Sequence, residues 1–96
     1  MVSSKAVIRN EKGLHLRPAG TFCKTALQYG CSIQIVNGDR IGNAKSMISV
    51  LSTLVRCGDE ITLICDGLDE ETALHELLGL IGSGLGDVMA EGETAE

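Results

Sequence analysis

The segment Ser32-Ile33-Gln34-Ile35-Val36-Asn37-Gly38 carries the clearest signal of tertiary structure in this chain. Its first five residues alternate between polar and apolar side chains, which is typical of a strand with one buried face. Asn37-Gly38 then favours a type I′ turn, whose two central residues both need a positive φ. The segment Arg40-Ile41-Gly42-Asn43 follows as a short returning strand. This region therefore predicts an antiparallel hairpin in the middle of the chain.

Strands and helices are predicted on both sides of the hairpin. Strands are expected over residues 3–9 and 59–65, and helices over 16–29, 46–54 and about 70–81. Apolar residues at intervals of three and four are expected on the buried helix faces: Ala19, Phe22, Cys23, Ala26 and Leu27; Met47, Val50, Leu51 and Leu54; Leu74, Leu77, Leu78 and Ile81. The order βαββαβα predicts an α+β fold, with an antiparallel or mixed sheet and the helices on one face.

The length of 96 residues predicts a single domain, because domains typically hold about 100–150 residues. We expect this domain over residues 1–85, followed by a frayed, acidic, glycine-containing tail over 86–96. No apolar run approaches the roughly 18 residues of a membrane span, and the N-terminus lacks the apolar run of a secretory signal. A cytoplasmic protein without membrane insertion is therefore expected.

The charges are distributed unevenly along the chain. Eight Lys and Arg against thirteen Asp and Glu give a net charge of −5, and only Phe22 and Tyr29 are aromatic, which argues against direct nucleic-acid binding. Residues 1–65 hold all eight cations and four of the acids, whereas residues 66–96 hold nine acids and no cation. The first part of the chain is therefore expected to meet an anion or an acidic partner.

The four cysteines, Cys23, Cys31, Cys57 and Cys65, form no Cys-x-x-Cys motif, and neither histidine lies at a zinc-finger interval. No metal site and no cofactor is expected. Reduced thiols are the favoured interpretation, although an even number of cysteines leaves a disulfide framework open.

The segment Gly13-Leu14-His15-Leu16-Arg17-Pro18-Ala19 carries the candidate chemistry. Pro18 fits only in the first turn of a helix, so His15 is placed at the helix N-cap, beside free backbone N–H groups. Those groups and Arg17 favour the neutral, nucleophilic imidazole, and they also stabilise a phosphoryl group attached to it. A reversibly phosphorylated histidine is predicted. The alternative is that His15 only caps the helix and that Arg17 is a solvated cation.

This heptapeptide resembles the active-site signature of the HPr family, the histidine-containing phosphocarriers of the bacterial phosphotransferase system. The resemblance continues through Ala44-Lys45-Ser46-Met47-Ile48 and Gly58-Asp59-Glu60-Ile61-Thr62 to the segment 66–74, and it covers about residues 3–85. It implies an open-faced β-sandwich with a four-stranded antiparallel sheet and three helices on one face. It also implies a monomeric carrier, not an enzyme, that accepts a phosphoryl group on Nδ1 of His15 from Enzyme I and passes it to Enzyme II A-domains for sugar uptake.

The resemblance also assigns roles to further residues. Leu16 and Arg17 are implied to stabilise the phosphoryl group, although Leu16 is larger than the residue that is common there. The residues implied to dock the partners are Gly20, Lys24, Lys45, Met47, Ile48 and Leu51, and plain core is the alternative for the three apolar ones. Lys12 stands where many relatives have a neutral residue, and it adds a cation near the imidazole or a contact to phosphate.

Ser46 is open to two interpretations. In some relatives the matching serine is phosphorylated by HPr kinase/phosphorylase, and the carrier then acts as a corepressor that binds a catabolite-control transcription factor. The simpler interpretation is an N-cap of the second helix. The resemblance therefore also admits a regulatory paralogue, for catabolite repression or for a nitrogen-related branch, that acts mainly as a binding module. The presence of His15 favours phosphoryl transfer.

Overall fold

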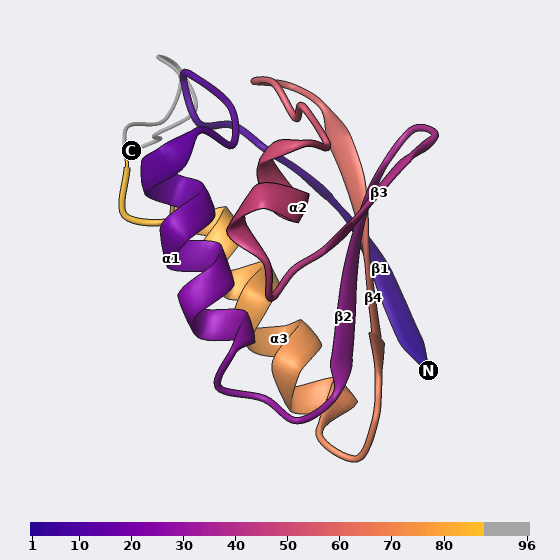
Figure 1. The fold of residues 1–96 in the computed structure, drawn as a ribbon. Coiled ribbons are helices and arrows are strands. Elements are labelled where there is room, and N and C mark those ends of the chain that lie inside the picture. The colour runs from indigo at the N-terminus through magenta and orange to yellow at the C-terminus, as the bar shows by residue number, and fades with distance from the viewer. Residues whose placement is uncertain (88–96) are drawn as a thin grey trace.

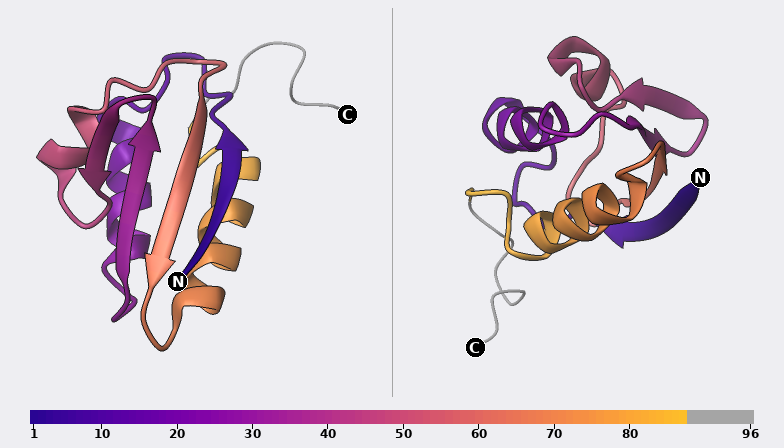
Figure 2. Two further views of the ribbon diagram at one scale, coloured as in Figure 1. Left: turned by 90° about the vertical axis from the view of Figure 1, so that its right-hand side faces the viewer. Right: turned by 90° about the horizontal axis from the view of Figure 1, so that it is seen from below.

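The computed structural model describes residues 1–87 and contains a four-stranded sheet and three helices. The elements along the chain are β1 (Val2–Val7), α1 (Leu16–Ala26), β2 (Ser32–Asn37), β3 (Arg40–Asn43), α2 (Met47–Leu51), β4 (Glu60–Asp66) and α3 (Glu70–Gly82). All three helices lie on one side of the sheet (Figure 1), and the other side is open (Figure 2, left). The predicted α+β fold and its βαββαβα order are confirmed.

The sheet has the strand order β1-β4-β2-β3, and every neighbouring pair is antiparallel. The central strand β4 pairs with β1 through Ala6 and Ile61, and with β2 through Ile35 and Leu63. Side chains alternate between the two faces of a strand, so one set of β4 residues faces the helices and the other faces the open side. The first set is buried and consists of Ile61, Leu63 and Cys65.

The turn of the central hairpin differs from the predicted one. Asn37 pairs with Arg40, so the central residues of the turn are Gly38 and Asp39 and not Asn37 and Gly38. Only Gly38 has a positive φ, of 65°, which is the pattern of a type II′ turn with glycine at the first central position. The hairpin itself is confirmed, but the type I′ turn is wrong because the strand register is shifted by one residue.

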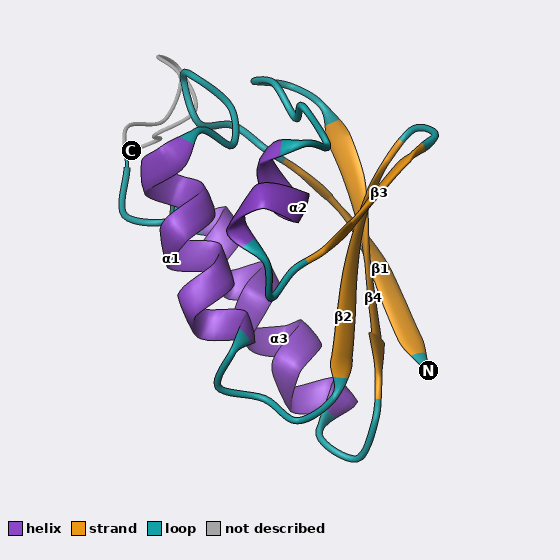
Figure 3. Cartoon of the chain, viewed as in Figure 1, coloured by secondary structure: helices purple, strands orange, loops and turns teal. Residues whose placement is uncertain are grey.

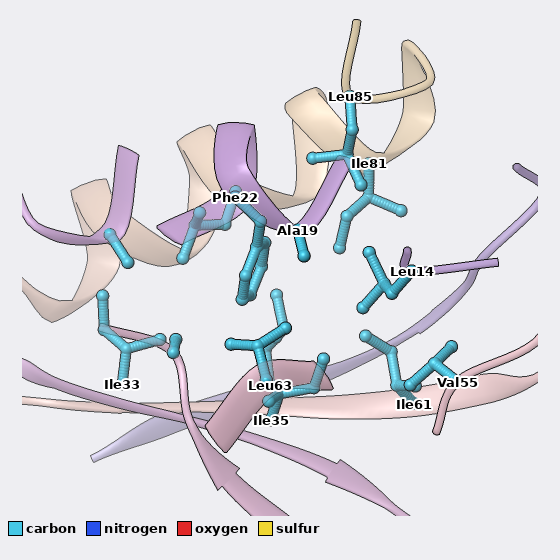
Figure 4. Packing of buried hydrophobic residues seen from close by; sticks show 14 of the residues in the cluster. Leu14, Ala19, Phe22, Ile33, Ile35, Val55, Ile61, Leu63, Ile81 and Leu85 are labelled. Atoms are coloured by element: carbon cyan, nitrogen blue, oxygen red, sulfur yellow. The ribbon is translucent and has the colours of Figure 1, made fainter. Parts of the chain in front are cut away.

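The hydrophobic core lies between the sheet and the three helices (Figure 4). Phe22 and Ala19 of α1 are fully buried above Ile35 and Leu63 of the sheet. Burial of a large apolar side chain of this kind contributes about 1.5–3 kcal/mol. Leu85 is also fully buried in this core, although it follows the last helix. The chain beyond α3 is therefore part of the packed structure as far as this residue.

Three details of the predicted helix faces are wrong. Leu27 lies just past the end of α1 and is exposed, whereas the spacing had placed it on the buried face. Helix α2 ends at Leu51, and Leu54 is exposed with a φ of 55° that no helix contains. On α3 the fully buried positions include Ala73, which the prediction omitted. The helices in Figure 3 are otherwise those expected from the spacing of apolar residues.

Among the described residues, no helix is both long and apolar enough to span a bilayer.

Candidate functional site

His15 is the N-cap residue of α1, as the sequence predicts. Its backbone is extended, and its carbonyl accepts the N–H of Ala19 at 2.9 Å, which is the first hydrogen bond of the helix. The imidazole makes no capping hydrogen bond. The helix geometry leaves the N–H groups of Leu16 and Arg17 without an intrahelical acceptor, and Pro18 has no N–H group to satisfy. The imidazole therefore stands at the positive end of the helix.

The loop that precedes His15 packs against the loop after α2 and forms a hydrogen bond with it. Gly13 has a φ of 68°, and a Cβ atom there would lie 2.3 Å from the carbonyl oxygen of Val55. Any other residue at position 13 is therefore excluded by both backbone conformation and space. The next residue, Leu14, is buried and donates its N–H to the Val55 carbonyl at 3.1 Å. These contacts fix the backbone from which the imidazole projects.

A carboxylate from the far end of the chain contacts the imidazole. Oδ2 of Asp87 lies 2.6 Å from Nε2 of His15, although the two residues are 72 positions apart. The side chain of His15 is 38% exposed and that of Asp87 is 11% exposed. Figure 1 shows how the chain after α3 returns past α1 toward this site. Asp87 belongs to the acid-rich second part of the sequence, so this part of the chain also reaches the site.

Five charged or titratable side chains surround a depression of about 300 Å3 at the start of α1. They are Glu11, Lys12, His15, Arg17 and Asp87. Two cations and two carboxylates thus share the depression with the imidazole, and Lys12 and Arg17 are the groups in it that can bind an anion. The predicted pair of His15 and Arg17 is brought together here, and so is Lys12. Glu11 and Asp87 were missed, because no motif or local spacing connects an acid at either position with the histidine.

The arrangement suits nucleophilic attack by one ring nitrogen. With Nε2 engaged by Asp87, Nδ1 is the nitrogen left to use its lone pair. Lys12 and Arg17 of the same depression, together with the start of α1, would favour an anion bound at Nδ1.

Comparison with known proteins identifies the family. Residues 2–83 match the family model described as the PTS HPr component phosphorylation site. The chain belongs to the HPr family. It is therefore a phosphocarrier of the phosphotransferase system, a protein that carries a phosphoryl group and is not itself an enzyme. This confirms the resemblance that the heptapeptide and the later segments predict.

The relatives that match over most of the chain include HPr proteins and the HPr-like protein Crh. The phosphocarrier protein HPr of Borreliella burgdorferi is 36% identical over 83 residues, which cover 86% of this chain and 96% of that protein. The HPr-like protein Crh of Bacillus subtilis is 35% identical over 81 residues, which cover 84% and 95%. A crystal structure of HPr from Thermoanaerobacter tengcongensis superposes with a TM-score of 0.88 at 35% identity and covers 93% of this chain and all of that one.

Of the residues that the HPr resemblance assigns to partner docking, five lie on α1 and α2, which contact each other, and Lys45 lies just before α2. Leu16 and Ile48 are exposed to 69% and 81%, so both present apolar surface to solvent. Lys24 is also exposed and lies in the last turn of α1. Gly20, Met47 and Leu51 are half-buried.

Lys45 is placed differently from the other cations of this face. Its Nζ donates to the backbone carbonyl of Tyr29 at 2.6 Å, just beyond the end of α1. Part of its hydrogen-bonding capacity is therefore used within the fold.

Ser46 is the N-cap of α2, and its hydroxyl accepts the N–H of Ser49 at 3.3 Å.

A second depression, of about 640 Å3, is lined in part by Leu51, one of the residues that the resemblance assigns to docking. Apolar side chains of Leu14, Leu51 and Leu54 line it together with the cationic Arg40 and Arg56. No local pattern connects either arginine with the histidine motif, because 20 residues lie between Ala19, the last residue of the motif, and Arg40.

Among residues 1–87, no group of three or more His, Cys, Asp or Glu is arranged to hold a metal ion. All four cysteines are free thiols, and three of them are buried while Cys57 is exposed. The structure thus favours reduced thiols over the disulfide framework that the sequence left open.

Proposed function

We propose that this protein accepts a phosphoryl group from phospho-Enzyme I on Nδ1 of His15 and passes it to Enzyme II A-domains during sugar uptake. The observation that carries the proposal is the position of the imidazole at the N-terminal end of α1, in one depression with Arg17 and Lys12. Membership of the HPr family supports the same partners.

In the proposed transfer, the carrier mainly positions the imidazole and the groups that surround it. The Nδ1 lone pair forms the new bond to phosphorus, the bond between phosphorus and the donor breaks, and the donor keeps that electron pair. The N–H groups at the start of α1 and the Arg17 guanidinium then stabilise the added negative charge. Because transfer to the acceptor reverses these steps, the site must hold the phosphoryl group firmly enough to carry it and loosely enough to release it.

Docking is proposed to use the exposed apolar and basic residues around His15. Leu16 and Ile48 supply exposed apolar surface, and Lys24 supplies positive charge at the other end of α1. Gly20, Met47 and Leu51 complete this surface between the two helices. Positive charge around an apolar patch suits acidic partner surfaces and speeds encounter.

Incubation with phosphoenolpyruvate and Enzyme I tests the proposal directly. The wild type is expected to gain one acid-labile phosphate, and His15→Ala is expected to gain none. His75→Ala serves as the matched control, because His75 lies exposed on α3 and should not affect labelling. An unlabelled wild type, or equal labelling of His15→Ala, contradicts the proposal.

Arg17→Ala is expected to slow the transfer to His15 by about tenfold. A hydrogen bond to a charged group contributes about 1.5–3 kcal/mol, and an exposed contact lies at the lower end of this range, which corresponds to about a factor of ten. Rapid-quench measurement of phosphoryl transfer from phospho-Enzyme I gives this rate. Lys24→Ala removes the same charge from the far end of α1 and should weaken docking with a smaller effect on the transfer step.

A second candidate function is regulation through Ser46. The similarity to Crh, at 35% identity, is about as high as that to HPr of Borreliella burgdorferi, at 36%. Phosphorylation at the N-cap of α2 adds about two negative charges beside Met47 and Ile48 and should repel acidic partners. The modified protein could then serve as a corepressor for a catabolite-control transcription factor.

Incubation with ATP and HPr kinase/phosphorylase distinguishes the two interpretations of Ser46. An acid-stable phosphate that is absent in Ser46→Ala and present in Ser52→Ala supports regulation. Ser52 is the matched control, since it is exposed at the other end of α2. No acid-stable phosphate in the wild type supports the simple helix cap.

A further inference from the structure

We propose that Asp87 is a positioning residue for His15, whose carboxylate holds the proton on Nε2 and so keeps the lone pair on Nδ1. The same contact stabilises the positive charge that the ring gains when Nδ1 binds phosphorus. This inference rests on the proposed phosphoryl transfer at His15 and adds a residue from the C-terminal segment to its site. The 2.6 Å contact between Asp87 and Nε2 is the observation that leads to it.

The turn that carries Asp87 has a defined backbone conformation and is held by contacts with the core. Three successive residues, Gly84, Leu85 and Gly86, have positive φ values of 93°, 54° and 72°. For Leu85 this conformation is unfavourable, and such a residue persists only where its surroundings hold it. Its side chain is fully buried in the core, and its N–H donates to the Leu80 carbonyl at 3.0 Å. The N–H of Asp87 then donates to the Gly84 carbonyl at 3.0 Å.

Asn10 connects this turn with the loop that precedes His15. It is a buried polar residue, 1% exposed, and its Nδ2 donates to the Gly84 carbonyl at 2.7 Å. Its own backbone carbonyl accepts the N–H of Gly13 at 2.9 Å. Asn10 therefore forms hydrogen bonds with both the loop that carries the imidazole and the turn that carries the carboxylate.

Burial and charge also support a specific role for this carboxylate. The Asp87 side chain is 11% exposed, and a carboxylate so far removed from water is costly unless polar or charged groups surround it. The groups that face the imidazole across the depression are Glu11, Lys12 and Arg17. Glu11 carries the same charge as Asp87, but among the described acids it is Asp87 that lies within hydrogen-bond distance of the ring.

The transfer step balances with the Nε2 proton in place. Nδ1 donates its lone pair to phosphorus, the donor takes the electrons of the broken bond, and the ring becomes a phosphorylated imidazolium with its proton still on Nε2. The Asp87 carboxylate neutralises this charge, so no proton has to leave during the transfer. On transfer to the acceptor, the electrons of the N–P bond return to Nδ1 and the ring is neutral again.

Two measurements on Asp87→Ala test the proposal, with Glu71→Gln, at an exposed acid of α3, as the control. Ring nitrogen chemical shifts of 15N-labelled histidine report the tautomer near neutral pH, and rapid quench reports the rate of phosphoryl acceptance from phospho-Enzyme I. In the wild type and Glu71→Gln, the neutral ring is expected to carry its proton on Nε2. In Asp87→Ala both tautomers are expected, and acceptance should slow by about tenfold, as for loss of a charged hydrogen bond at a partly exposed site.

Wild-type ring shifts together with a wild-type rate in Asp87→Ala overturn the proposal. If Asp87→Ala does not fold, Asp87→Asn keeps the shape of the side chain and removes the charge, and the same two measurements apply to it. If no variant and no wild type accepts a phosphoryl group, the proposed function fails, whereas the ring shifts still decide whether Asp87 positions the imidazole. The two proposals can therefore fail separately.

Discussion

Asp69 shows how a single side chain can connect distant parts of this fold. It is the N-cap residue of α3, yet its carboxylate makes no capping hydrogen bond. Instead it accepts the N–H of Gly30 at 2.8 Å and that of Cys31 at 2.9 Å, between α1 and β2. These backbone hydrogen bonds, that from Gly30 above all, lower the pKa of Asp69 below its ordinary value of 3.8.

A lowered pKa in the folded state makes stability depend on pH in a defined direction. The Asp69 carboxylate stabilises the fold above its ordinary pKa, and this stabilisation is lost as the pH falls through the lowered value. Asp69→Asn is therefore expected to be less stable than the wild type at pH 7, with a difference that shrinks toward acidic pH. Urea unfolding from pH 7 to pH 2 measures it, with Asp39→Asn in the exposed hairpin turn as the control. A difference that does not change with pH would be evidence against this role.

At the scale of elements, the short strand β3 and the short helix α2 pack closely against each other. A Cβ atom at Gly42 of β3 would lie 2.7 Å from the carbonyl oxygen of Ser49 and 2.8 Å from Cγ2 of Thr53. The strand can therefore approach α2 this closely only because residue 42 has no side chain. Gly20 of α1 differs, because a Cβ atom there has no neighbour within 4 Å.

These two glycines predict opposite effects of the same substitution. Gly42→Ala should destabilise the protein by about 1–3 kcal/mol, because the contact between strand and helix must open. Gly20→Ala should stabilise it by about 0.5–1 kcal/mol, because alanine restricts the unfolded chain and favours the helix. Urea titrations of both variants give the free energies of unfolding. A midpoint for Gly42→Ala at or above that of the wild type would contradict the packing described for Gly42.

At the scale of the whole molecule, the chain after α3 closes the core and reaches the site. Leu85 is fully buried, while Asp87 two residues later contacts His15. The acid-rich second part of the sequence is therefore not confined to a solvated face. Its last described residue lies among the cations that the first part contributes.

Leu85→Ala is expected to destabilise the protein by about 2–5 kcal/mol, because it leaves a cavity between α3 and the rest of the core. Leu68→Ala makes the same chemical change at a fully exposed residue, and it should alter stability by no more than about 0.5 kcal/mol. Thermal and urea unfolding of the two variants compare them. Equal stability of both would show that the turn after α3 is not packed in solution.

Much of this protein follows from local patterns in the chain. The hairpin, the three helices and the N-cap positions of His15 and Ser46 depend on alternation, on helical spacing and on residues with special backbone preferences. Each of these signals acts over a few neighbouring residues, so they can be read without knowing the rest of the fold. The pairing of His15 with Arg17 belongs to the same class, because two residues on one helix turn remain close in any packing.

Other features depend on how distant segments pack. Strand register places the hairpin turn at Gly38 and Asp39. Contacts between elements determine that α2 ends at Leu51 and that Lys45 donates a hydrogen bond to the Tyr29 carbonyl. The contact between His15 and Asp87 spans 72 positions and requires the buried Leu85 and the Asn10 bridge between two loops. Periodicity carries no information about such contacts, because they arise only when the core brings the two ends of the chain together.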